Sequence, residues 1–309
     1  MPVAEIARRI PRATERATHY RVERLIRRGV MRLGVIVDPR AVGFPVSAEV
    51  LVKVEPGCVQ AVAERLAELE LVSYVACTLG NHDVGITMYA RDNAELYTMV
   101  TRDVASVPGV KETTIALVPL LLKDVYHWQI PDSEIPSEIP PKQPPFVHPQ
   151  LAAKSIDPVD REIVHLLMED ARMPAAHIAR RIGSITPRAA GDRIDSLVRD
   201  GVICITAILD PEKVGFPVRA DMHIKVESDH ILDVARKLAG LEETTWVACA
   251  IGESDLGVQI CVRENSELYR FVTEVIHNVP GITRTSTTLV SQILKDRYDW
   301  RLPDSVFEH

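Results

Sequence analysis

The first 28 residues of the chain are dense in arginine and have the chemistry needed to contact phosphate groups. Eight arginines stand at positions 8, 9, 12, 16, 21, 24, 27 and 28, against three glutamates, although the 309-residue chain carries a net charge of −7. Guanidinium groups neutralise and hydrogen-bond the phosphates of nucleic acid. A solvated arginine-rich helical face has the same composition, so the interpretation depends on the elements that hold these side chains.

Other chemistry is not indicated by the residue pattern. No Ser-His-Asp arrangement, phosphate loop or metal-ligand spacing stands out, so we predict no catalytic residue, no metal site and no cofactor. The five cysteines are scattered without a CxxC pair, which favours reduced thiols over a disulfide framework. Cys77 and Cys249 could form a redox-sensing pair, but we expect buried small hydrophobic side chains.

The chain is a tandem repeat. IARRI at 6–10 recurs at 178–182, and DPRAVGFPV at 38–46 recurs as DPEKVGFPV at 210–218, so both pairs are offset by 172 residues. At this offset residues 2–133 align with residues 174–305 without a gap, and about 60 of about 132 positions are identical, which indicates a duplication. A proline-rich linker at 131–155 separates the copies; a ligand for a proline-binding domain is the alternative reading.

Each copy begins with a helix-turn-helix pattern, and the second copy has one helix more. The stretch SIDPVDREIVHLLMEDAR at 155–172 predicts an amphipathic helix that Asp157 can cap, residues 174–182 predict the next helix, and Thr186 caps a third helix that ends before Gly201. The first copy has no counterpart of the stretch at 155–172. Either its start lies too far downstream or the first module is incomplete.

The candidate DNA-contacting residues are the polar side chains at the turn and along the last helix of each copy. The solvent-facing side chains of the two last helices differ: Arg16 and Tyr20 in the first copy correspond to Arg188 and Asp192 in the second. We therefore predict an asymmetric DNA site. The full set comprises Arg12, Thr14, Arg16, His19, Tyr20, Arg27, Ser184, Thr186, Arg188, Arg193 and Arg199.

After a β-branched strand at 202–210, which would act as a wing or connector, each copy follows the order β-α-β-β-α-β, the ferredoxin-like split motif. We therefore predict an α+β fold with two copies of a winged helix-turn-helix followed by a βαββαβ module. The two sheets are expected to pack against each other as a pseudo-dimer. The predicted domains are 1–34 (helix-turn-helix without its first helix), 35–130 (βαββαβ), 131–155 (linker), 156–206 (winged helix-turn-helix) and 207–309 (βαββαβ).

The ordered set IARRI…TPRAAGDRIDSLVRDGVI, LDPEKVGF, GESDL and VPGI resembles the leucine-responsive/AsnC (feast-famine) transcriptional regulators, applied twice. The resemblance implies an αβ module that dimerises, assembles further and binds a small effector, often an amino acid, near a Gly-x-x-Asp turn. Here these turns are Gly80-Asn81-His82-Asp83 and Gly252-Glu253-Ser254-Asp255. A plain hairpin turn is the alternative reading, because Gly, Asn and Asp dominate turns. If both turns bind effectors, their different middle residues allow two different ligands.

The expected function is therefore a DNA-binding transcriptional regulator with double-stranded DNA, a small effector and further copies of itself as partners. An enzyme similar to the sirohaem decarboxylases, which share this architecture, is the first alternative. The histidines speak against it because they do not cluster: His82 and His223 align with Ser254 and Leu51 of the other copy. An effector-binding protein with decayed DNA readers is the second alternative.

The sequence shows neither a membrane-spanning segment nor a secretory signal, and this sets the expected cellular compartment. The longest apolar run is eight residues, from Ile115 to Leu122, and the N-terminus has no secretory design. We expect a cytoplasmic protein with no membrane partner. The last strand of the first copy, ALVPLLLKD, is apolar on both faces and is a candidate oligomer contact; burial within its own half is the alternative.

Overall fold

The computed structural model describes residues 3–125, 128, 130–131, 156–297 and 300. The predicted linker lies outside the described residues except at its first position. Within the described part of the chain, no helix has the length and apolar character needed to cross a membrane.

The two halves repeat the same elements. The first half contains, in order, α1 (Val3–Arg9), α2 (Glu15–Arg27), β1 (Met31–Val37), β2 (Val46–Val54), α3 (Val59–Ala67), β3 (Val72–Leu79), β4 (Val84–Ala90), α4 (Asn93–Thr98) and β5 (Val110–Lys123). The second half contains α5 (Pro158–Glu169), α6 (Ala175–Ile182), α7 (Pro187–Arg199), β6 (Ile203–Leu209), β7 (Val218–Val226), α8 (Ile231–Ala239), β8 (Thr244–Ile251), β9 (Leu256–Val262), α9 (Asn265–Arg270) and β10 (Ile282–Lys295). The βαββαβ order is thus confirmed in both halves.

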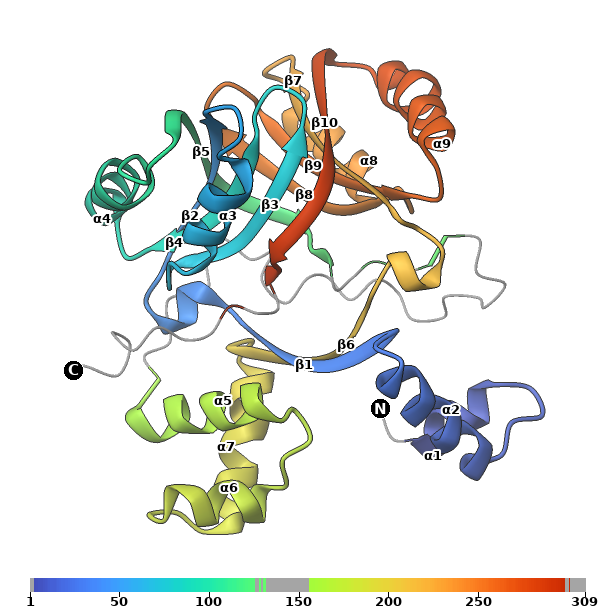
Figure 1. The fold of residues 1–309 in the computed structure, drawn as a ribbon. Helices are drawn as coiled ribbons and strands as arrows, with labels where there is room; N and C mark the ends of the chain where they lie inside the picture. The colour runs from blue at the N-terminus through green and yellow to red at the C-terminus, as the bar shows by residue number, and fades with distance from the viewer. Residues whose placement is uncertain (1–2, 126–127, 129, 132–155, 298–299, 301–309) are drawn as a thin grey trace.

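Eight strands close into one barrel, in the order β10-β3-β4-β2-β5-β8-β9-β7 (Figure 1). The two halves are joined by their long last strands. β5 pairs with β2 of its own half and then with β8, where Leu120 lies opposite Cys249, and β10 pairs equivalently with β3. The predicted pseudo-dimer is therefore present as an intramolecular barrel. The apolar β5 finds its partner in the other half of the same chain, and Leu120 packs on that half's core.

Alternating side chains on the barrel strands build two cores outside the barrel and one layer inside it. On β2, Ala48, Val50 and Val52 are fully buried beneath α3 and α4, while Glu49 and Leu51 point to the other face. The second core is built equivalently beneath α8 and α9. The two expected buried cysteines, Cys77 and Cys249, are free thiols in these cores, and burial raises the pKa of both.

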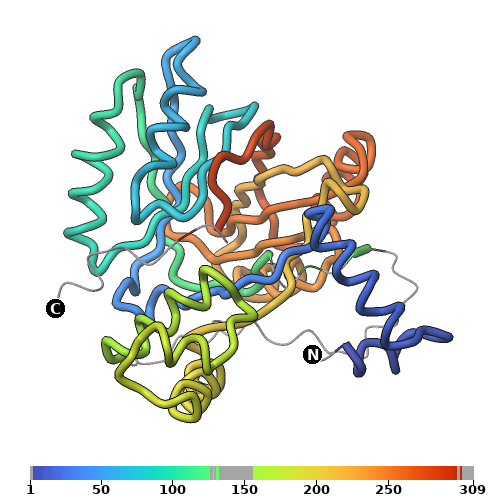
Figure 2. The backbone as a smooth tube through the Cα atoms, turned by 60° about the horizontal axis from the view of Figure 1, so that its bottom comes forward, coloured from blue at the N-terminus to red at the C-terminus, as the bar shows by residue number. Residues whose placement is uncertain are grey.

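A two-stranded ribbon connects the barrel to the helical regions. β1 and β6 pair antiparallel from Met31 opposite Leu209 to Val37 opposite Ile203, and the ribbon runs across the barrel end that faces the helices (Figures 1 and 2). The predicted domain boundaries at 34/35 and 206/207 fall inside these strands. The strands therefore act as connectors that pair with each other rather than as separate wings.

The helical regions differ as the repeat predicts. Asp157 caps α5 by accepting from the Asp160 backbone amide, and Ile163, Leu166 and Leu167 of α5 are buried against α6, α7 and β1. Among the described residues the first copy has α1 and α2 alone, so the prediction of two winged helix-turn-helix copies is wrong for it; the complete helix-turn-helix of the described chain is the α5–α7 unit.

The expected apolar faces of the last helices are only partly buried. Leu25 on α2 is 40% exposed and Ile10, just after α1, is also exposed, because within the described ranges no third helix covers them. The helical period of the sequence predicts that Ala190, Ile194, Leu197 and Val198 form the buried stripe of α7. Ala190 and Leu197 are buried, whereas Val198 is exposed.

Candidate nucleic-acid interface and ligand cleft

The start of α7 presents polar side chains to solvent from a rigid support. Gly183 ends α6 in the left-handed conformation (φ +78°), and the Thr186 hydroxyl caps α7 by accepting from the Ala189 amide at 3.2 Å. Just beyond the cap, the Arg188 side chain is 92% exposed, with Asp192 one turn later at 3.9 Å. Ser184, Thr186 and Arg199 are exposed too. A helix start of this kind can enter the major groove of DNA.

Arg193 differs from the other predicted DNA contacts because it holds the helical unit together. Its guanidinium donates to the carboxylates of Asp157 and Asp160, both at 2.7 Å. Hydrogen bonding to Asp160 and Asp157 raises the pKa of Arg193. The geometry therefore assigns Arg193 to the attachment of α5 to α7, and not to the exposed face.

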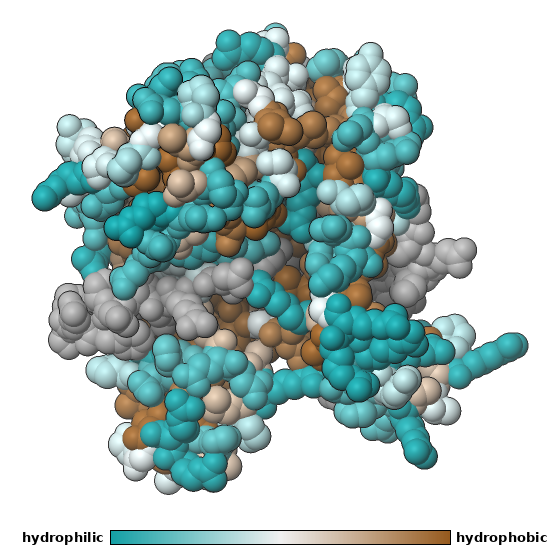
Figure 3. Space-filling view, viewed as in Figure 1, coloured by the Kyte–Doolittle hydropathy of each residue, from teal (hydrophilic) through white to brown (hydrophobic). Residues whose placement is uncertain are grey.

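The N-terminal helices carry the remaining predicted contacts. Thr14 caps α2 by accepting from the Ala17 amide at 3.2 Å, and Arg12 stands in the preceding turn with φ +61°. Arg16, His19, Tyr20 and Arg27 are exposed, and the surface over these helices is largely hydrophilic (Figure 3). One ion pair, Arg172 to Glu23 at 2.9 Å, connects α2 to the turn after α5.

The two Gly-x-x-Asp turns lie at the same end of the barrel, each against the long strand of the other half. Asn81 donates to the Ser286 hydroxyl at 2.6 Å, and a Cβ on Gly80 would stand 2.7 Å from the Thr288 hydroxyl. A Cβ on Gly252 would stand 3.0 Å from the Ile115 carbonyl oxygen. Both glycines are thus required by close approach across the seam between the halves.

The aspartates of the turns are used structurally. Asp83 accepts from the Val54 amide at 2.8 Å, and Asp255 accepts from the Val226 amide at 2.9 Å and from the Lys225 ammonium at 3.0 Å. Each carboxylate therefore ties its turn to the end of the neighbouring strand. Within the turns, the groups left to meet a ligand are those of the middle residues.

These middle residues line one shared cleft instead of two separate sites. The cleft has a volume of about 710 Å³ and opens at the barrel end that bears the turns. Its walls come from both halves. The lining residues are Leu51, Lys53, Asn81, His82, Glu112, Thr114, Ala116, His223, Lys225, Glu253, Ser254, Arg284, Thr285, Ser286 and Thr287.

Two histidines meet at the floor of the cleft. The rings of His82 and His223 are 5.9 Å apart, edge to face, and His223 Nε2 lies 3.9 Å from Glu49 Oε2. Burial, and secondarily His223, lowers the pKa of His82 to about 4, while burial raises the pKa of Glu49. His82 Nε2 and Glu49 Oε2 have no hydrogen-bond partner among the described residues. The expectation that the histidines do not cluster is therefore wrong for this pair.

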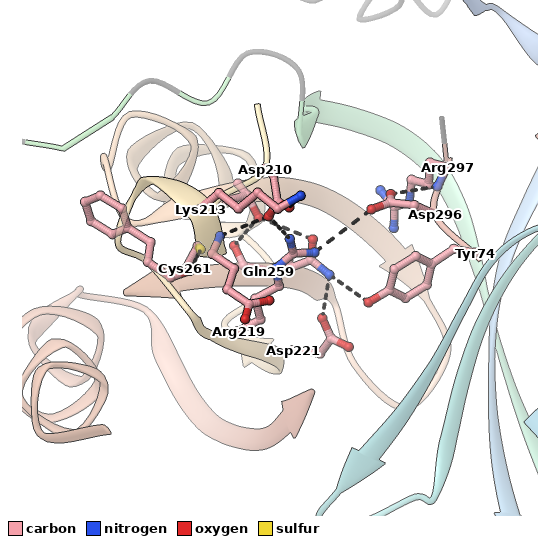
Figure 4. A network of polar contacts seen from close by, with 12 residues as sticks. Tyr74, Asp210, Lys213, Arg219, Asp221, Gln259, Cys261, Asp296 and Arg297 are labelled. Carbon is pink, nitrogen blue, oxygen red and sulfur yellow. Dashed lines mark hydrogen bonds and ion pairs between the residues drawn. The ribbon is translucent and has the colours of Figure 1, made fainter. Parts of the chain in front are cut away.

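Below the histidines, polar side chains continue through the barrel. The Arg297 guanidinium stacks on Trp246 at 4.5 Å and on Tyr74 at 5.4 Å. Gln259 donates to the Tyr74 hydroxyl at 3.2 Å and to Asp221 at 3.0 Å. Figure 4 shows this network, which extends outward through Arg219 and Asp296. Buried polar groups of this kind are kept when they are paired or when they meet a ligand.

The strand patterns predict that the second face of each sheet packs against the other half, but they do not predict that polar side chains form a network in that interior. The available signal is the repeat itself: Glu49 and Asp221 are equivalent, and both stand amid apolar neighbours on strands that must face another layer. The network comprises Glu49, Tyr74, Asp221, His223, Trp246, Gln259 and Arg297.

Two further cavities lie between the ribbon and the barrel, in equivalent places but of unequal size. The larger, about 530 Å³, is lined by polar groups that include Arg32, Arg219 and Asp296. The smaller, about 130 Å³, has an apolar lining that includes Phe44, Tyr89, Trp246 and Trp300. Aromatic side chains stand at both places, because Trp128 and Phe216, the repeat equivalents of Trp300 and Phe44, also pack edge to face at 5.3 Å.

Two family models match the chain, and together they span most of the elements described above. The Lrp/AsnC ligand binding domain matches residues 47–124 and again residues 219–300. The AsnC-type helix-turn-helix domain matches residues 156–198, which are the α5–α7 unit apart from its last residue. The residues of α1 and α2 fall outside these matches.

Individual proteins that are similar in sequence are also HTH-type transcriptional regulators. An uncharacterized HTH-type transcriptional regulator of Pyrococcus abyssi is 33% identical over 144 residues, which are 46% of this chain and 90% of that protein. The HTH-type transcriptional regulator FL11 of the same organism is 33% identical over 143 residues, 46% of this chain and 93% of that protein. In fold, the chain is similar to the siroheme decarboxylase NirDL in co-complex with an iron-uroporphyrin III analogue. The TM-score is 0.64 at 18% identity, over 96% of this chain and 87% of that chain.

Proposed function

Because the chain belongs to the Lrp/AsnC family, we propose that it is a DNA-binding transcriptional regulator that responds to a small effector. The observation that carries the proposal is the intact α5–α7 unit, which holds the start of α7 in the open with Arg188 almost fully exposed. An arginine at this place can donate two hydrogen bonds to a guanine edge, and its neighbours can bind backbone phosphates.

In the proposed complex, α7 reads the major groove and the N-terminal helices add phosphate contacts. Arg16, Tyr20 and Arg27 lie on an exposed and basic surface, which supplies charge without the support of a third helix. The two readers present different side chains to DNA, with Arg16 and Tyr20 on one side and Arg188 and Asp192 on the other. A regulator of this kind would bind an operator with unlike halves.

The DNA proposal is tested by selecting duplexes from a random library and measuring their affinity by fluorescence anisotropy. Arg188→Ala should weaken binding by about tenfold or more, the loss expected for one bidentate base contact. Arg236→Ala, which removes an exposed arginine from α8 on the barrel, is the matched control and should leave affinity unchanged.

Several outcomes would contradict the proposal. Affinity that does not fall between about 50 and 200 mM salt would exclude phosphate-driven binding. Equal affinity for a perfect palindrome and for the selected duplex would contradict the unlike halves. A chain that binds a small effector but no duplex would instead be an effector-binding protein with decayed readers.

We further propose that copies of the chain associate through the exposed ends of β3 and β8. Leu79 and Ile251 occupy equivalent positions and are 65% and 62% exposed, directly before the two turns. Repeated apolar side chains at one barrel end are typical of an interface. The Leu79→Ser/Ile251→Ser variant should sediment as a smaller species than the parent chain, and equal sedimentation would exclude this contact.

A second candidate function is an enzyme of the sirohaem decarboxylase type. The fold likeness over 96% of the chain and the buried His82, His223 and Arg297 favour it. The test is anaerobic incubation of the purified chain with sirohaem, followed by mass spectrometry of the tetrapyrrole. We expect an unchanged mass; loss of carbon dioxide that depends on His223 would make the chain an enzyme.

A further inference from the structure

The cleft at the barrel end has walls of opposite charge. We propose that it binds one small dipolar ligand per chain, with an anionic and a cationic group close together as in a free α-amino acid, in one fixed orientation. The proposal rests on the proposed effector function, from which it takes an α-amino acid as the ligand class, and adds the number of ligands per chain and their direction.

One wall is positive. It is formed by β7, β10 and the turn at 80–83, which is held on β10 by the 2.6 Å hydrogen bond from Asn81 to Ser286. Arg284 on β10 lies opposite Lys225 on β7 in the strand register. The Lys225 ammonium is already engaged with Asp255 at 3.0 Å. Arg284 has no ion pair within the described part of the chain, so its guanidinium is available to a carboxylate.

The opposite wall is negative. It is formed by β2, β5 and the turn at 252–255, whose Gly252 packs against the backbone of β5. Glu112 on β5 forms an ion pair with Lys53 on β2 at 3.0 Å, and both side chains are more than half exposed. Glu253 in the turn has no ion pair among the described residues. This wall thus carries two carboxylates against the ammonium of Lys53, and a cationic group of a ligand is attracted to Glu253.

The charges differ because the two halves have diverged at the positions that face each other across the cleft. At the repeat offset of 172, Glu112 corresponds to Arg284 and Asn81 corresponds to Glu253. Two identical halves would present identical walls, and a dipolar ligand could then bind in two equivalent directions. Here the carboxylate end is attracted to the Arg284 wall and the cationic end to the Glu253 wall.

The floor of the cleft is uneven in the same way. The buried His82 stands where the second half has Ser254, and His223 stands where the first half has Leu51. His82 Nε2 has no hydrogen-bond partner among the described residues, but the atom is buried, so His82 shapes the floor and the charged walls orient the ligand. The floor and the walls thus break the pseudo-symmetry in the same half-dependent way.

The first experiment is isothermal titration calorimetry of the full chain with a panel of free L-α-amino acids. The tightest ligand should bind with one site per chain. Its N-acetyl derivative and its carboxamide should each bind at least about tenfold more weakly, because each lacks one of the two charges. Two sites per chain, or equal affinity for either derivative, would overturn the proposal.

The second experiment exchanges the charges of the walls. Arg284→Glu and Glu112→Arg alone should each weaken binding by about tenfold or more, and the double variant should recover at least part of the loss by binding the ligand in the reverse direction. Arg236→Glu, outside the cleft, is the control. If the double variant is as weak as the weaker single variant, the charged walls do not orient the ligand.

Ligand binding in the cleft and DNA binding by α7 are tested independently. If no amino acid binds while DNA affinity depends on salt and on Arg188, the regulator function stands and the cleft proposal falls. If an amino acid binds as predicted but no duplex does, the cleft proposal stands and the DNA-reading function falls.

Discussion

The buried His82 predicts how the stability of the protein depends on pH. Its pKa is lowered from 6.5 to about 4, chiefly because burial disfavours the charged ring. Between these values the unfolded chain binds a proton that the folded chain does not bind, so the free energy of unfolding rises with pH across this window. The difference amounts to about 2 kcal/mol at pH 5 and about 3 kcal/mol at pH 4.

The perturbation that isolates this effect is His82→Ser, because serine is the residue that the second half carries at the same position, Ser254. Urea unfolding of parent and variant is measured at pH 7 and pH 5. Between these two pH values, the parent should lose about 2 kcal/mol more stability than the variant. Glu49, whose pKa is raised, contributes with the opposite sign but is present in both proteins, so its contribution cancels in the comparison.

A matched control and an independent probe make the prediction refutable. His177→Ser removes an exposed histidine from α6 and should leave the parent's pH dependence unchanged. The NMR resonance of the His82 ring should titrate with a midpoint near pH 4 in the folded protein. A midpoint near 6.5, or equal loss of stability in the parent and His82→Ser, would show that the ring is hydrated and would refute the reasoning.

Three further substitutions test the supports of the two sites. Arg193→Ala should destabilise the α5–α7 unit by about 1 kcal/mol, a value reduced for its partial exposure, and should speed hydrogen exchange there while the barrel is unchanged. Gly252→Ala should lower the free energy of unfolding by about 1–3 kcal/mol, because the new Cβ would crowd the backbone of β5. Gly191→Ala should not lower it, because there is space for a Cβ at this position of α7. Arg297→Met should cost about 3–5 kcal/mol at pH 7, because it removes the guanidinium that lies 4.0 Å from the buried Asp124 carboxylate and near Glu49; urea unfolding should show a smaller loss at low pH as Glu49 is protonated.

Local patterns were sufficient to predict the elements that depend on neighbouring residues. Asp157, Pro158 and the apolar residues that follow define α5 by capping and periodicity, and the structure places that helix at Pro158–Glu169. The strands of both βαββαβ modules follow from their alternation in the same way. Within α7 the prediction of a buried Val198 failed, because the width of the covered face depends on which helices pack there.

The patterns predict that the sheets of the two halves pack together, but not which strands pair across the seam or which side chains meet inside. The alternation on β2 shows that Glu49 and Val50 face opposite ways, but not which side chains of the other half Glu49 meets. The seams between β5 and β8 and between β10 and β3 bring together residues that are more than one hundred positions apart. His82 and His223 were compared with their repeat equivalents, whereas a twofold arrangement brings non-equivalent positions into contact across the axis.

Fusion of the halves explains why the interior can hold a single buried cation. Arg297 lies between Trp246 and Tyr74 at the centre of the barrel, and its repeat equivalent is Val125. In a dimer of identical chains, every side chain near the axis occurs twice, so a guanidinium at this place would face a copy of itself. Repulsion between two buried cations would then oppose the attraction of each to the nearby carboxylates. A fused chain avoids this repulsion by changing one half only, and the same freedom permits Arg284 to face Glu253 across the cleft. The asymmetry of the buried core and that of the ligand cleft therefore have one cause, which is that both lie on the axis that relates the two halves.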